Sequence, residues 1–176
     1  TQVREVELSA QQKKLMADLK RDLQIVIKTG QPITAINEGS IRLKFIQISA
    51  GAVYDANHVA HAVDAEPRHS EIETVIQETS RKVVIFAGLT SMINLLYKRL
   101  SKRWPCATLN GEVSPRERAD VIERFGREDD SLRIVICDPQ AASHGINQFV
   151  TADTCIWATP CEKTELYLQG IKRLMR

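Results

Sequence analysis

Hydrophobic residues in the first part of the chain, residues 1–81, recur mainly at helical spacing. Alternating positions predict a short strand over residues 3–8, after which Ser9 and Gln12 have the spacing of a capping box. The helix that follows is expected to end near Lys28, before a Thr-Gly-Gln-Pro turn. Its buried face is predicted at Leu15, Leu19, Leu23 and Val26.

Two more helices are predicted in this lead-in, one from about Thr34 to Ser49 and one from about His69 to Thr79. The segment between them, residues 51–67, has no clear periodicity and is predicted to be a loop. The lead-in is therefore expected to be mainly helical. Its histidines lack a convincing fourth ligand, so no metal site is predicted at them. They are His58, His61 and His69.

From residue 82 the pattern changes, because short unbroken apolar runs alternate with amphipathic stretches. Such runs are typical of parallel strands that are buried on both faces. They are expected at residues 83–86, 107–109, 132–137 and 154–157. The sequence therefore predicts an α/β domain over residues 82–176, with an open parallel sheet flanked by helices and right-handed crossovers.

The helices between these strands have recognisable start signals. Thr90 is expected to cap the first, and Ser114 with Glu117 forms a second capping box around a proline at the first helical position. The buried positions predicted for these helices are Ile93, Leu96, Tyr97 and Leu100 in the first, and Val121, Ile122 and Phe125 in the second.

Composition excludes only a few classes of protein. The 176 residues are 43% hydrophobic, enough for a real core, and a net charge of +2 predicts no polyanionic partner by itself. The four cysteines contain no C-x-x-C pair and are expected to be free thiols in a reducing compartment. No apolar stretch approaches the roughly 18 residues that cross a bilayer, so we expect a cytoplasmic protein with no membrane partner.

Candidate chemistry follows from the expected sheet, because ligands of such sheets gather at the carboxyl ends of the strands. After the third strand, residues 138–147 combine small residues with Ser143, His144, Gly145 and Asn147. A loop of this kind is able to bring backbone amides close to phosphate oxygens. An ordinary connecting loop has a similar composition, so the loop alone decides nothing.

The last predicted helix has two different faces. At about 100° per residue, Gln169, Arg173 and Arg176 lie within about 60° of one another. The opposite side is apolar and is formed by Tyr167, Ile171 and Leu174. The first face offers forked donors suited to anionic oxygens such as those of a nucleoside triphosphate. A solvated basic helix end would show the same pattern.

Four segments in this order resemble motifs of the C-terminal helicase domain of superfamily 2, specifically of the Swi/Snf-like translocases and their phage relatives. They are Val83 to Gly88; Leu109-Asn110-Gly111 with Glu117-Arg118 and Phe125; residues 141–153; and residues 169–176. Residues 1–81 match more loosely, through residues 47–51 among others. Gln140 and Ser143-His144 depart from the Arg and Gly-rich spacing of the chromatin-remodelling branch.

The resemblance implies a RecA-like lobe with a shared ATP site. Arg173 and Arg176 would be the catalytic arginines, stabilising charge on the γ-phosphate during hydrolysis. Gln169, Gly145 and Asn147 would contribute to the ATP site. The residues implied to contact the nucleic-acid backbone are Ser143, His144 and Gly88. Such contacts go largely to phosphates, so no sequence preference is expected.

The 176 residues contain no G-x-x-x-x-G-K-[ST] motif and no acidic pair at a strand end. ATP and Mg²⁺ are therefore expected to be held mainly by an N-terminal RecA-like lobe of the same protein. The resemblance implies an ATP-dependent helicase or translocase that is inactive without that lobe, and it favours DNA over RNA as the partner. A non-catalytic RecA-like scaffold is the alternative. A Rossmann-type enzyme is disfavoured, because no G-x-G-x-x-G follows a strand.

Overall fold

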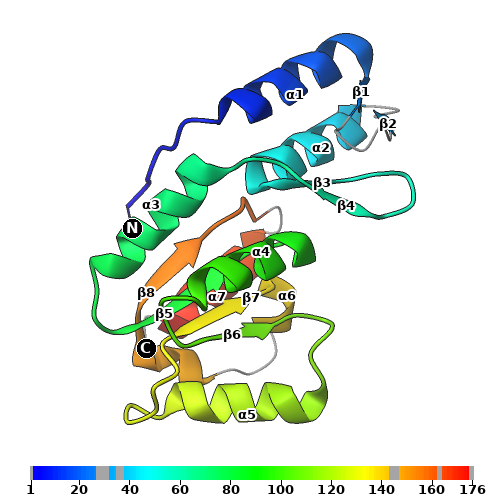
Figure 1. Ribbon diagram of the computed structural model, residues 1–176. Coiled ribbons are helices and arrows are strands. Elements are labelled where there is room, and N and C mark those ends of the chain that lie inside the picture. Colours follow the sequence, from blue (N-terminus) through cyan, green and yellow to red (C-terminus); the bar gives the residue numbers. More distant parts are fainter. Residues whose placement is uncertain (1, 27–31, 35–37, 143–146, 162–163, 175–176) are drawn as a thin grey trace. The chain divides into compact units, whose positions relative to one another are not determined.

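The computed structural model describes residues 2–26, 32–34, 38–142, 147–161 and 164–174 (Figure 1). Of these, residues 24–26, 32, 34, 38, 142, 147, 148, 169 and 171–174 are described by their backbone alone. The chain divides into two compact units, residues 1–71 and residues 72–176. The boundary predicted between residues 81 and 82 falls within the second unit, and it stays a prediction.

The first unit combines helices with short antiparallel hairpins. Its elements are α1 (Ala10–Asp22), β1 (Gln24–Val26), β2 (Pro32–Thr34), α2 (Glu38–Ala50), β3 (Ala52–Tyr54), β4 (Ala60–Ala62) and the start of α3 (Glu66–Gln77). Strand β1 pairs with β2, and β3 pairs with β4. Side chains from the helices and the hairpin regions form its core: Leu15, Leu19, Ile33, Ile48, Val53 and Val63. The lead-in is therefore less purely helical than predicted.

The start of this unit is only partly as the sequence predicts. The capping box is confirmed, because the Ser9 hydroxyl accepts a hydrogen bond from the Gln12 N–H and the Gln12 side chain accepts one from the Ser9 N–H. The strand predicted over residues 3–8 is wrong, since this segment is extended chain that pairs with no described strand. Its apolar residue Val3 is 84% exposed.

The predicted end of the first helix is also wrong. Helix α1 stops at Asp22, because Leu23 adopts a left-handed φ of 56° and its N–H donates to the Leu19 carbonyl. The Leu23 side chain is 46% exposed, and Val26 belongs to β1, so the buried stripe ends at Leu19. The second helix likewise begins at Glu38, after β2.

A hairpin of β3 and β4 lies in the segment that was predicted to be a loop. Asp55 holds its turn, because its carboxylate accepts hydrogen bonds from the N–H of Asn57 at 2.9 Å and of Val59 at 3.0 Å. The same carboxylate lies 2.9 Å from Nε2 of His61, and these hydrogen bonds, led by that of His61, hold the pKa of Asp55 below its ordinary value. His61 is thus a partner of the turn.

The second unit is built on a four-stranded parallel sheet with the order β6-β7-β5-β8. Its elements after α3 are β5 (Lys82–Phe86), α4 (Thr90–Leu100), β6 (Cys106–Leu109), α5 (Pro115–Gly126), β7 (Ile134–Cys137), α6 (Pro139–Ala142), η1 (Asn147–Thr151), β8 (Ala152–Trp157) and α7 (Thr164–Leu174). The prediction of an α/β fold with an open parallel sheet is confirmed, and each strand lies within two residues of its expected position.

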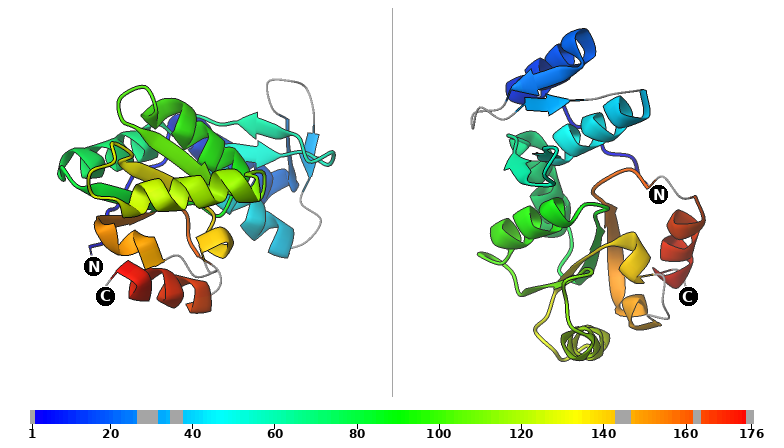
Figure 2. Two further views of the ribbon diagram at one scale, coloured as in Figure 1. Left: turned by 90° about the horizontal axis from the view of Figure 1, so that it is seen from below. Right: turned by 90° about the vertical axis from the view of Figure 1, so that its right-hand side faces the viewer.

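Helices lie on both faces of this sheet (Figure 2). The chain crosses the sheet in one direction from β5 to β6 and in the other from β6 to β7, so crossovers of one hand place α4 and α5 on opposite faces. On the face of α5, one core cluster joins Phe125 with Val84, Phe86 and Phe149. Helix α4 buries its own apolar side chains, namely Met92, Ile93, Leu96 and Leu100.

The start signals of the two helices have different outcomes. The N-cap of α4 is Leu89, which makes no side-chain cap hydrogen bond, so the predicted cap at Thr90 is wrong. The predicted burial of Ile93, Leu96 and Leu100 is confirmed, whereas Tyr97 is 42% exposed and Met92 is buried instead. At α5 the capping box of Ser114 is confirmed, and Phe125 is fully buried as predicted.

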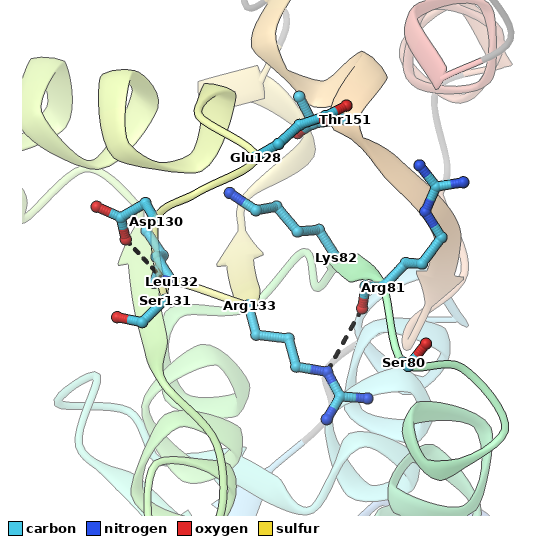
Figure 3. A pocket seen from close by; sticks show the side chains of 9 residues that line it. All are labelled: Ser80, Arg81, Lys82, Glu128, Asp130, Ser131, Leu132, Arg133 and Thr151. Carbon is cyan, nitrogen blue, oxygen red and sulfur yellow. Dashed lines mark hydrogen bonds between the residues drawn. The ribbon is translucent and has the colours of Figure 1, made fainter.

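A cavity of about 360 Å³ lies at the amino-terminal edge of the sheet, with Lys82 extending along it (Figure 3). The Lys82 Nζ donates hydrogen bonds to three carbonyls at the end of α5: Arg124 at 3.3 Å, Phe125 at 2.8 Å and Arg127 at 2.5 Å. Burial lowers the pKa of Lys82, and nearby acidic residues oppose that shift. The cavity lies at the edge opposite the carboxyl ends of the strands, so it is separate from the candidate site.

Replacing Lys82 by methionine tests the role of this ammonium group. Lys82→Met keeps the apolar stem but removes the donor to the last carbonyls of α5, so it should lower the free energy of unfolding by about 2 kcal/mol. Urea unfolding followed by tryptophan fluorescence measures the change. The control is Lys98→Met on the exposed end of α4, which should unfold like the unmodified chain. Equal stability of both variants would contradict this assignment.

Candidate functional site

The carboxyl ends of the four strands form one continuous hydrogen-bonded edge. Backbone hydrogen bonds extend the ladder past the strand ends: Ala87 N–H to Cys137 O at 3.0 Å, Asp138 N–H to Leu109 O at 3.0 Å, and Ala158 N–H to Phe86 O at 2.9 Å. The loops that leave this edge therefore start from fixed positions. In open parallel sheets this is the edge at which ligands bind.

Gly88 lies on this edge and is exposed. Its N–H donates to Oγ1 of Thr159 at 2.9 Å, and the Thr159 side chain is buried. This hydrogen bond joins the segments that follow β5 and β8. The Gly88 amide therefore already has a partner in the protein, and no sequence pattern predicts this hydrogen bond.

The segment after β7 is held at two points before it reaches the loop with the predicted phosphate contacts. Asp138 accepts a hydrogen bond from the Gln140 N–H at 2.6 Å, which fixes the first turn of α6. A guanidinium nitrogen of Arg118, on α5, donates to the Ala141 carbonyl. Arg118 thus connects α5 to the segment that enters residues 143–146.

Helix α7 packs unusually closely on the sheet at Gly170. A Cβ atom built on this buried glycine would lie 2.9 Å from Cζ2 of Trp157 and 3.3 Å from Cε2 of Phe86. The Trp157 ring lies between two other rings, with centroids 4.5 Å from Phe86 and 4.9 Å from Tyr167. Tyr167 belongs to α7 itself, so we call the two rings beneath the helix, Phe86 and Trp157, the aromatic seat of α7.

Gly170 contacts the last residues of β5 and β8, so this part of α7 is level with the carboxyl ends of those strands. The backbone of Arg173 lies three residues further along the same helix. At a rise of about 1.5 Å per residue, it is roughly 4.5 Å further along the helix axis, less than one turn. The backbone of Arg173 in α7 therefore lies near the carboxyl ends of β5 and β8.

The predicted site residues differ in how far the structure describes them. Gly88 lies on the carboxyl edge, Asn147 begins η1, and Gln169 and Arg173 belong to the backbone of α7. The side chains of Asn147, Gln169 and Arg173 are outside the described part of the chain, and their roles stay predictions. Four predicted site residues lie wholly outside the described residues: Ser143, His144, Gly145 and Arg176.

Two thiols of the sheet, Cys137 and Cys155, are unsuited to nucleophilic chemistry. The four cysteines form no disulfide among the described residues, and Cys137 is completely buried. Burial raises the pKa of Cys137 well above its ordinary value and that of Cys155 to about 12, so both stay protonated near neutral pH. Within the described ranges no group of His, Cys, Asp and Glu side chains has a metal-binding arrangement, and no helix is long and apolar enough to cross a membrane.

Comparison with known families identifies the lobe. The sequence model described as helicase conserved C-terminal domain matches residues 68–176. The chain belongs to this helicase family. The α/β sheet of the second unit is thus the RecA-like sheet of a helicase C-terminal domain, as the motifs predict.

Solved structures similar to this helicase domain are C-terminal parts of Swi2/Snf2 ATPases. The C-terminal part of the Fun30 ATPase domain is 25% identical, with a TM-score of 0.55 over 66% of this chain and 37% of that one. The Sulfolobus solfataricus SWI2/SNF2 ATPase C-terminal domain is 19% identical, with a TM-score of 0.53 over 74% of this chain and 59% of that one.

A further structure, the Sulfolobus solfataricus SWI2/SNF2 ATPase core in complex with dsDNA, is 20% identical, with a TM-score of 0.53. The match covers 76% of this chain and 29% of that one. The helicase domain therefore spans only part of each of these structures. A comparison with curated protein sequences finds no match.

The hydrogen bond of Gly88 yields a test of the carboxyl edge. Thr159→Val removes the acceptor while keeping the side-chain volume, so the free energy of unfolding should fall by about 1 kcal/mol. Thr159→Ser keeps the hydroxyl and should retain most of that stability. Denaturant unfolding compares the two variants, and identical losses in both would show that the hydroxyl contributes nothing.

Proposed function

We propose that this helicase C-terminal domain is the second RecA-like lobe of an ATP-dependent DNA helicase or translocase. In this proposal the N-terminal lobe of the same protein holds most of the ATP and Mg²⁺, and the present lobe completes the site from the other side. The observation that supports it best is the docking of α7 at Gly170, beside the last residues of β5 and β8. The helix that contains Arg173 is thus packed directly on the sheet three residues before this arginine.

The proposed chemistry is electrostatic. Transfer of a phosphoryl group places charge on its oxygens in the transition state, and arginine stabilises such charge with a planar fork of donors. Arg173 and Arg176 have this role in the proposal, and Gln169 couples the nucleotide state to closure of the lobes. Gly145 and Asn147 line the ATP site. Because the fork is delivered from a helix seated on aromatic rings, little reorganisation is needed during the reaction.

The proposed DNA contacts belong to the loops at the carboxyl edge. Ser143, His144 and the region of Gly88 contact phosphates in this proposal, which gives binding without sequence preference. Since the Gly88 amide donates to Thr159, Gly88 contributes by allowing close approach of the backbone rather than through its N–H. Arg118 and Asp138 support the loop from its amino-terminal side. The complex of a SWI2/SNF2 ATPase core with dsDNA favours DNA over RNA.

Arg173 provides the test of the catalytic role. In the full-length protein, Arg173→Ala should lower the kcat of DNA-stimulated ATP hydrolysis by roughly 10² to 10⁵, as expected for an arginine that stabilises transition-state charge. Arg173→Lys should restore little, because a point charge does not reproduce the planar fork. Steady-state ATPase assays measure both variants. Full activity of Arg173→Ala would leave the non-catalytic scaffold as the better account.

The division of labour between the lobes yields a separate prediction. The 176-residue chain alone should bind ATP no more tightly than the millimolar range, because a few exposed charge contacts supply little free energy. It should show no ATP hydrolysis with or without DNA. Isothermal titration calorimetry measures the affinity, with the full-length protein as the positive control. A micromolar dissociation constant for the chain alone would contradict the shared site.

A further inference from the structure

At Gly170, α7 approaches the sheet closely through residues to which the helicase motifs assign no task. Real Cβ atoms almost never come within 3.0 Å of a heavy atom of a residue distant in the chain, yet a Cβ at Gly170 would lie 2.9 Å from the Trp157 ring and 3.3 Å from the Phe86 ring. Glycine in a helix interior is less favourable than alanine by about 1 kcal/mol. The glycine therefore lowers the stability of the helix locally. In return, the absence of a side chain lets α7 pack closely on the aromatic seat.

Trp157 is the part of this seat nearest to Gly170, and it acts through its shape. Its ring packs between those of Phe86 and Tyr167. The Phe86 ring in turn packs against Phe149 in the core of the lobe, with ring centroids 6.4 Å apart. The Trp157 Nε1 is buried and has no hydrogen-bond partner among the described residues. An unpaired N–H is unfavourable in such a place, so the indole is suited to filling the space under α7 rather than to making a polar contact.

We propose that Gly170 and Trp157 are positioning residues for the arginine helix: their contact sets the distance of Arg173 from the interlobe ATP site. This inference rests on the proposed function. Gly170 precedes Arg173 by less than one turn, so a shift of α7 at the glycine moves the arginine backbone with it. A misplacement of roughly 1 Å is enough to cost about 10²-fold in rate when a group must meet a transition state.

Gly170→Ala in the full-length protein tests the depth of the seat. The added methyl group should push α7 away from Trp157 and lower kcat for DNA-stimulated ATP hydrolysis by about tenfold to a hundredfold. The KM for ATP and the affinity for DNA should change little, because most of those contacts lie elsewhere. Thermal unfolding checks that the assay is made on folded protein. A Gly170→Ala enzyme with at least half the normal kcat would overturn the inference.

A compensating change separates positioning from general damage. The atom closest to the new methyl belongs to the six-membered part of the indole, which Trp157→Phe removes together with the unpaired N–H. The double variant Trp157→Phe/Gly170→Ala should therefore recover most of the kcat lost in Gly170→Ala. A double variant as slow as or slower than Gly170→Ala would show that the steric contact does not set the rate.

If Gly170→Ala does not fold, Tyr167→Leu tests the inference instead, because it removes the other ring next to Trp157. This variant should give the same selective loss of kcat, and an unchanged kcat would overturn the inference.

A spectroscopic measurement tests the seat without nucleotide. The chain has two tryptophans, so Trp104→Phe leaves Trp157 as the single reporter. In this background Gly170→Ala should shift the emission to longer wavelength and increase quenching by acrylamide, because water reaches the indole when α7 moves. The matched control is Gly111→Ala, where a Cβ would have no neighbour within 4 Å, and its spectrum should be unchanged. An unchanged spectrum in Gly170→Ala would contradict the displacement.

Arg173→Ala in the same ATPase assay distinguishes failure of this inference from failure of the proposed function. If Arg173→Ala is slow and Gly170→Ala is not, the seat is not a positioning device but the arginine keeps its role. If Arg173→Ala is fully active, both the catalytic role and its positioning are wrong.

Discussion

The lobe depends on complete burial of its central strand. Every residue of β5, from Lys82 to Phe86, is buried, with β7 hydrogen-bonded on one side and β8 on the other. A strand in this position has no room for polar side chains unless each finds a partner. Lys82 is the exception that satisfies this rule, because its ammonium group reaches carbonyls at the end of α5. The helices on both faces of the sheet provide this burial.

The same strand connects the core to the candidate chemistry. Its last residue, Phe86, belongs both to the core cluster on the face of α5 and to the aromatic seat under α7. The residues that follow it lead to Gly88, whose amide donates to Thr159 after β8. The strand that fills the core of the lobe therefore also sets the positions from which the loops at the carboxyl edge begin. An edge held by backbone hydrogen bonds suits the proposed role, in which the lobe presents charge to a shared ATP site.

Sequence patterns located the sheet because parallel strands appear as unbroken apolar runs. They also located the capping boxes of Ser9 and Ser114, which are local signals. These patterns did not predict elements whose position depends on turn conformation or on pairing between strands. The left-handed turn at Leu23 ends α1 early although the apolar spacing continues, and β3 and β4 are too short, at 3 residues each, to show a period.

The candidate site shows the same division. The motif arginine and the helix that contains it are visible in the sequence, since Gln169 and Arg173 share one helical face. The role of Gly170 is not visible in the sequence. It depends on contacts with the rings of Phe86 and Trp157, which belong to strands distant in the chain. The partner of the Gly88 amide, Thr159, is likewise 71 residues away along the chain.

The central claim is that Arg173 completes an ATP site held mainly by another lobe. The most direct measurement is a structure of the full-length protein bound to DNA, ADP and aluminium fluoride, which mimics the phosphoryl group in transfer. The account predicts the Arg173 guanidinium within about 3 Å of the fluoride ligands, the distance of a charge-assisted hydrogen bond. A guanidinium directed into solvent, with the fluoride contacted by the N-terminal lobe alone, would contradict it.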